Sequence, residues 1–226
     1  MSLPSVYCAA GTPGRDPEAN LERIRQWASE ASAAGAGLLL TPELFVAAEA
    51  GGEAVVRERL RLAARTAGVG IVASTPERTG ERVFVGADWW DAAGQLVAHV
   101  RKRRLSGWQR SRGFSGWTGR PEIIRAVAYT LCGNNGPVGV AFAEDAADPA
   151  QAYFLRDHGV RPVLVLAATS TAVRTLAPAR PWGAKHTGAP FPQAGPLPEP
   201  LLRPLPRFAD AWWSPSIPRG TADLGS

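Results

Sequence analysis

The chain has 226 residues, of which 45% are hydrophobic and 20% charged, enough for one globular domain with a sizeable core. Its net charge of +5 comes mostly from arginines scattered along the chain, which favours a solvated basic surface over nucleic-acid binding. No apolar run reaches the roughly 18 residues of a membrane span and no secretory leader is evident, so we expect a cytoplasmic protein without a membrane partner.

The first part of the chain alternates strands with helices. The short apolar run 5–10 predicts a strand, and Asp16-Pro17-Glu18 then supplies an N-cap, a proline and an acid for a helix that closes near Gly35. The run Leu38–Leu40 predicts a strand that is buried on both faces. Glu43 therefore lies just past the C-terminal end of a strand, where open α/β sheets usually hold their ligands.

The middle of the chain shows helical periodicity first and extended hairpins afterwards. Every local signal up to residue 170 agrees with an α/β sandwich, and such agreement is itself a sign of a real fold. We predict, in chain order, a helix over 53–67, a strand over 70–75, a hairpin of 82–90 with 95–103, a second hairpin of 126–131 with 138–143, a helix over 150–158 and a strand over 162–168.

The last part of the chain has a different composition. Residues 171–226 hold 11 of the 20 prolines, and proline can neither donate to a β-ladder nor occupy a helix interior. We therefore divide the chain into a folded domain over 1–170 and a Pro/Arg-rich tail over 171–226 with little regular structure.

Three landmarks, in this order, resemble the nitrilase-like carbon–nitrogen hydrolases. The first is the strand ending in Pro42-Glu43-Leu44, and the second is the hairpin that leads into the basic cluster 101–104. The third is an apolar strand ending in Ala143-Glu144-Asp145, where the family has Cys-x-Asp, with Pro149 four residues beyond the aspartate. The resemblance implies an α/β fold with an α-β-β-α sandwich, incomplete at its C-terminus because the family's last third is not recognisable after Ser170.

The same resemblance assigns roles to residues of this chain. In the family, a cysteine thiolate attacks an amide or nitrile carbon, a glutamate relays protons and a lysine stabilises the developing charge, without a cofactor. The glutamate maps onto Glu43 and the lysine onto Lys102, whereas Ala143 occupies the position of the cysteine. A methyl group cannot act as a nucleophile, so the resemblance implies a hydrolase that is inactive as written.

Further residues bear on this interpretation. The family's second glutamate, about seven residues after the lysine, is replaced by Gln109, whose amide keeps a hydrogen bond but lacks the charge that would pair with the lysine. Cys8 and Cys132 are expected on other strands, so neither can replace the nucleophile, and their spacing suggests no metal site.

Several alternatives stay open at the level of sequence. Ala143 fits an engineered substitution or a reading error in an amidase or nitrilase. It also fits a natural pseudoenzyme, a binding or oligomer-forming subunit that keeps the pocket for a small amide, a nitrile or an analogue. A truncated or frame-shifted product would explain the proline-rich tail. Lys102 lies in a basic cluster, so nucleic-acid binding is a fourth and weaker alternative. Family members usually pair through the sandwich, which predicts a homodimer.

Overall fold

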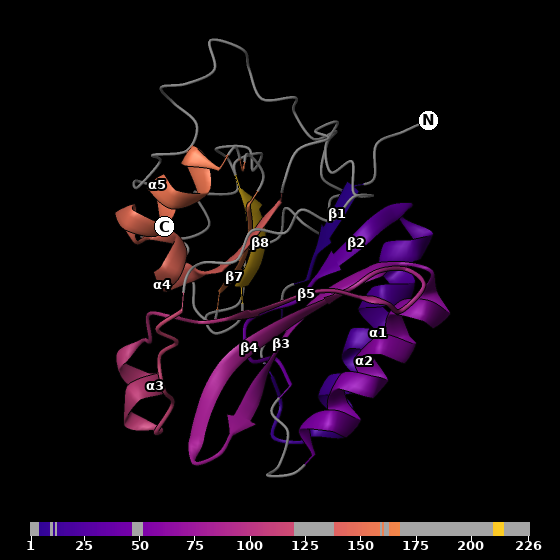
Figure 1. Ribbon diagram of the computed structural model, residues 1–226. Helices are drawn as coiled ribbons and strands as arrows, with labels where there is room; N and C mark the ends of the chain where they lie inside the picture. Colours follow the sequence, from indigo (N-terminus) through magenta and orange to yellow (C-terminus); the bar gives the residue numbers. More distant parts are fainter. Residues whose placement is uncertain are drawn as a thin grey trace, which may run out of the picture.

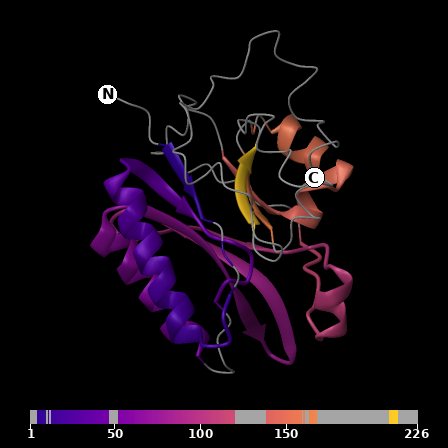
Figure 2. The ribbon, with the colours of Figure 1, turned by 180° about the vertical axis from the view of Figure 1, so that it is seen from behind.

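The computed structural model describes residues 5–9, 11, 13–46, 52–119, 138–158, 160, 163–167 and 210–214. Two β-sheets face each other in the middle of the molecule, and helices cover the outer side of each sheet (Figures 1 and 2). Within the described part of the chain, no helix combines the length and the apolar character that a membrane crossing needs.

The first sheet has five strands in the order β1-β2-β3-β4-β5. β1, β2 and β3 run parallel, whereas β3, β4 and β5 form an antiparallel meander. The predicted strands and the predicted first hairpin are confirmed, but β3 runs on to Thr79 and forms a further hairpin with β4 that was not predicted. The strands are β1 (Ser5–Cys8), β2 (Ala36–Leu40), β3 (Gly70–Thr79), β4 (Arg82–Trp90) and β5 (Leu96–Arg101).

Two long helices, α1 (Pro17–Ala33) and α2 (Glu53–Ala67), cover the outer face of this sheet (Figure 1). The Asp16 side chain accepts the backbone N–H of Glu18, which caps α1 as predicted. Gly68 ends α2 with a φ of 65°, a left-handed conformation that a residue without a Cβ adopts readily. The predicted bounds of both helices are therefore confirmed.

The second sheet has the strand order β6-β7-β8, with β6 parallel and β8 antiparallel to β7. The predicted partner of β6 over 126–131 lies outside the described residues, and the described partner of β6 is β7. The remaining elements are β6 (Gly139–Phe142), β7 (Val163–Ala167), β8 (Asp210–Ser214), α3 (Gly107–Ser111), α4 (Ala143–Ala146) and α5 (Pro149–Asp157).

β8 lies inside the tail of 171–226, for which little regular structure is expected. Its sequence, Asp-Ala-Trp-Trp-Ser, contains no proline, so each residue can take part in the ladder with β7. The rest of 171–226 lies outside the described residues.

Three apolar layers separate the helices and sheets. The first lies between α1, α2 and the five-stranded sheet, the second between the two sheets, and the third between the second sheet and α4 and α5. The predicted α-β-β-α sandwich is confirmed. Representative side chains are Ile24, Leu60 and Trp90 in the first layer, Leu40, Trp89, Phe142 and Leu164 in the second, and Ala146, Leu155 and Val165 in the third.

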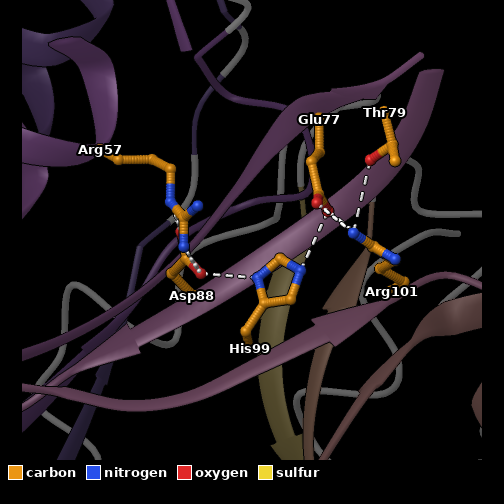
Figure 3. A network of polar contacts seen from close by, with 6 residues as sticks. All are labelled: Arg57, Glu77, Thr79, Asp88, His99 and Arg101. Carbon is orange, nitrogen blue, oxygen red and sulfur yellow. Dashed lines mark hydrogen bonds and ion pairs between the residues drawn. The ribbon is translucent and has the colours of Figure 1, made fainter. Parts of the chain in front are cut away.

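A network of charged side chains joins α2 to the antiparallel strands (Figure 3). Arg57 of α2 pairs with the buried Asp88 of β4 at 2.6 Å. His99 of β5 lies between two carboxylates, with Nδ1 2.7 Å from Asp88 Oδ1 and Nε2 3.0 Å from Glu77 Oε2 of β3. Arg101, the last residue of β5, also pairs with Glu77. The network fixes the end of β5, from which the chain continues directly into Lys102.

Candidate functional site

Glu43 lies in the turn that follows β2 and is only 2% exposed. Its backbone N–H donates to the carbonyl of Ala167 in β7 at 3.2 Å, so this turn connects the two sheets. The next residue, Leu44, has a φ of 52°, in the left-handed region that non-glycine residues rarely adopt. The turn therefore holds backbone strain, a feature that clusters at functional sites.

Lys102 follows β5 and has a fully buried side chain. Its backbone N–H donates to Val85 at 2.8 Å and its carbonyl accepts from Trp117 at 2.9 Å, so its main chain is fixed on both sides. Its Nζ lies 2.6 Å from Glu43 Oε1. As strand alternation predicts, the preceding Arg101 points to the opposite face and joins the network of Figure 3.

Gln109 contacts Glu43 instead of the lysine with which the family's second glutamate would pair. It lies in α3, whose first turn is a capping box in which the Gln109 Oε1 accepts the Ser106 N–H at 3.0 Å. Its Nε2 donates to Glu43 Oε1 at 2.5 Å. Glu43 Oε1 thus accepts two hydrogen bonds, while the buried Glu43 Oε2 has no hydrogen-bond partner within the described residues.

Ala143 is the first residue of α4 and follows β6 directly, so it occupies a strand-to-helix junction and is buried. The residues directly before and after Ala143 both lie close to the Lys102 ammonium group. The ring of Phe142 lies 5.6 Å from Lys102 Nζ, and Glu144 Oε2 lies 2.5 Å from the same nitrogen. The structure thus gathers Glu43, Lys102 and Gln109 with the junction that holds Ala143.

Asp145 ties this junction to the segment that follows Lys102. Its two carboxylate oxygens accept the backbone N–H groups of Arg103, at 3.0 Å, and Arg104, at 2.7 Å. Burial raises the pKa of Asp145 to about 6, although the two backbone N–H groups oppose the change. Burial also raises the pKa of Glu43, with the charge of Lys102 acting in the opposite direction. Both carboxyl groups are thus brought closer to the range in which a group can exchange protons near neutral pH.

Glu144 is the residue of this cluster for which no role was predicted from the sequence. The only signal was an acidic side chain directly after the predicted junction, and a contact with Lys102 could not be inferred without the relative position of the two sheets. Cys8 lies half-buried in β1, and Cys132 lies outside the described residues. Among the residues that the structure describes, no group of three or more His, Cys, Asp or Glu side chains is placed to hold a metal ion.

The model of the carbon–nitrogen hydrolase family matches residues 7–190 of this chain. Among solved structures, a glutamate-to-glutamine variant of the amidase from Nesterenkonia sp. AN1, which shows Michael addition of acrylamide at the active site cysteine, is 26% identical to this chain. The match covers 79% of this chain and 74% of the amidase chain, with a TM-score of 0.68.

A cysteine-to-alanine variant of the same amidase, in complex with butyramide, is 28% identical and covers 77% of this chain and 70% of its own, with a TM-score of 0.66. A second structure of the cysteine-to-alanine variant, described as an amidase from the nitrilase superfamily, is 29% identical with the same coverage and the same TM-score. No curated protein matches the sequence of this chain.

Proposed function

This chain belongs to the carbon–nitrogen hydrolase family, and from this premise we propose that it binds small amides or nitriles at Glu43 and Lys102 without hydrolysing them. The observation that carries the proposal is the junction at Ala143. A buried methyl group occupies the position that the family resemblance gives to the nucleophile, while the carboxylate and the ammonium group remain in contact beside it.

The polar atoms of the site match those of a primary amide. The Lys102 ammonium has three N–H donors. One donates to Glu43 Oε1, and Glu144 Oε2 forms an ion pair with the same nitrogen, so within the described residues a donor remains for the carbonyl oxygen of a ligand. Glu43 Oε2 has no partner among the described residues and can accept an N–H of the ligand's amide group. Because this oxygen is buried, a ligand that donates to it also removes the cost of leaving it without a hydrogen bond.

Without a thiol the reaction has no covalent route. In the family reaction the sulfur forms a bond to the carbonyl carbon and the amine leaves with a proton from the glutamate. Loss of an essential nucleophile lowers the rate by as much as about 10⁶ in a serine protease. A related amidase is in complex with butyramide as a cysteine-to-alanine variant, which supports binding without turnover at such a site.

The first test of this proposal uses two measurements on the chain as given. We expect saturable binding of butyramide by calorimetry, and no ammonia release above the uncatalysed background. We then expect Ala143→Cys to create ammonia release from butyramide, and Glu43→Gln or Lys102→Ala in that background to abolish it.

The matched control is Ala146→Cys, which puts a thiol three residues along the same helix, in the apolar layer against α5. This variant should stay inactive. The proposal is wrong if the given chain hydrolyses butyramide, or if it folds yet binds none of a panel of small amides and nitriles.

Two finer expectations, a homodimer and a cytoplasmic location, stay predictions. Sedimentation of the purified chain decides the first, since a monomer at micromolar concentration would contradict it.

A further inference from the structure

Glu144 presents a second carboxylate to Lys102. Its Oε2 lies 2.5 Å from the ammonium nitrogen, as close as Glu43 Oε1 at 2.6 Å. The two acids reach the lysine from different parts of the fold, since Glu43 follows β2 and Glu144 lies in the first turn of α4. Their exposure also differs: the side chain of Glu43 is fully buried, whereas that of Glu144 is 31% exposed.

A second carboxylate near Lys102 matters for the charge balance of this buried ammonium group. Burying an ammonium group is costly unless carboxylates compensate it and its donors are satisfied. In the family the second carboxylate stands at the position of Gln109, and here that position carries a neutral amide. With Glu144 counted, Lys102 again has two carboxylates in its surroundings.

The contact that Gln109 makes is also consistent with a carboxylate at position 144 in place of one at position 109. Its amide nitrogen donates to Glu43 Oε1 at 2.5 Å, a bond that an ionised carboxylate at position 109 could not make because it has no proton to donate. A carboxylate at 109 would instead face the carboxylate of Glu43 across that short distance. A glutamine at 109 and a glutamate at 144 are therefore mutually consistent in this site.

We propose that Glu144 is the second carboxylate of this amide site, moved from position 109 to the first turn of α4. Glu144 acts as a positioning residue: its carboxylate pairs with the Lys102 ammonium from the more exposed side, Glu43 accepts a hydrogen bond from it on the buried side, and an N–H stays directed to the ligand's carbonyl oxygen. The proposal rests on the proposed function for its ligand, but the pairing of Glu144 with Lys102 can be tested without any ligand.

The chain offers a clean spectroscopic probe because it contains two lysines, Lys102 and Lys185. Protein labelled with ¹⁵N and ¹³C in lysine alone gives two side-chain signals, and Lys102→Arg assigns them. The variants are Glu144→Gln, Gln109→Glu and the double variant, which returns the carboxylate to position 109. Glu81→Gln, at an exposed turn, is the matched control for the loss of one negative charge.

In the absence of ligand, we expect Glu144→Gln to shift the Lys102 side-chain signal, the double variant to shift it back, and Glu81→Gln to leave it unchanged. Butyramide binding should weaken about tenfold or more in each single variant and return to within about threefold of the given chain in the double variant, because residues in contact are not additive. Should Glu144→Gln fail to unfold cooperatively, Glu144→Asp keeps the charge and should give a smaller shift of the same signal.

An unchanged Lys102 signal in Glu144→Gln, or a double variant no better than the worse single variant, would overturn the proposal. If the given chain does not bind butyramide at all, the proposed function fails, and the Lys102 signal still decides whether Glu144 holds the lysine.

Discussion

Asp145 controls the position of Lys102 without touching it. Its carboxylate accepts the N–H groups of the two residues that follow the lysine, so hydrogen bonds connect α4 to the segment that follows β5. Because the carboxylate is almost fully buried, each of these N–H groups would lose its only described acceptor if the oxygens were removed. The placement of Lys102 against Glu43 and Glu144 thus depends on an acid outside their direct contacts.

We expect Asp145→Asn to lower the free energy of unfolding by about 1–3 kcal/mol, because an amide has one acceptor oxygen and leaves one of the two N–H groups unpaired. Butyramide binding should weaken as well. The matched control is Asp148→Asn. Asparagine keeps the cap on the Ala150 N–H, and the ion pair with the exposed Arg104 that this variant loses contributes less than about 1 kcal/mol. Urea unfolding checks both variants, and equal losses in the two would contradict the prediction.

At the scale of elements, the network of Figure 3 predicts how stability depends on pH. Hydrogen bonds to Asp88 and Glu77 raise the pKa of His99 to about 9. Burial pushes the pKa of Glu77 upward, but the hydrogen bonds from Arg101 and His99 prevail and lower it to about 2. Below pH 6.5, the usual pKa of histidine, His99 therefore contributes its full stabilisation to the fold. This contribution is lost as the pH rises to about 9. Glu77 contributes its full stabilisation above pH 4.5, the usual pKa of glutamate, and this contribution is lost as the pH falls towards 2.

Both contributions are complete only between about pH 4.5 and 6.5, so the network is most stabilising there. Raising the pH from 6.5 to 9 should remove roughly 2 kcal/mol, a value reduced because the histidine side chain is partly exposed. Urea unfolding at pH 5.5, 7.5 and 9 measures the slope. In His99→Gln this part of the slope should disappear, and an unchanged slope would show that other groups cause it.

The same elements show how far the sequence predicted the fold. Periodicity, caps and turn residues predicted α1, α2 and the strand ends that carry Glu43 and Lys102, because these signals are local. The extension of β3 was missed because Pro76 interrupts the strand pattern. Beyond residue 72, β3 no longer pairs with β2, so the missing N–H of this proline costs nothing on that side of the sheet.

The contacts within the site were less predictable than its members. Glu43 and Lys102 are 59 residues apart, and their pairing follows from the resemblance and not from any local signal. The contacts of Gln109 with Glu43 and of Glu144 with Lys102 depend on how the two sheets and α3 pack against one another. Such packing is a property of the folded chain, which sequence patterns at the level of single elements do not contain.

At the scale of the whole molecule, the second sheet depends on a strand that lies far along the chain. β8 pairs antiparallel with β7 over Val163–Ala167, while β6 occupies the other side of β7. β7 also carries the Ala167 carbonyl that accepts the Glu43 N–H, so a shift of this strand also shifts Glu43. Without β8, one side of β7 would present unpaired N–H and carbonyl groups, which is the usual template for aggregation.

This arrangement predicts different behaviour for two shortened chains. A chain ending at residue 214 keeps β8, whereas a chain ending at residue 209 loses it. We expect the first to unfold cooperatively near the temperature of the full chain, and the second to have a midpoint lower by on the order of 10 °C and to aggregate at micromolar concentration. Thermal unfolding and size-exclusion chromatography measure both effects. If the two shortened chains are equally stable and monodisperse, the pairing of β8 with β7 is not part of the folded domain, and the division at residue 170 holds as first predicted.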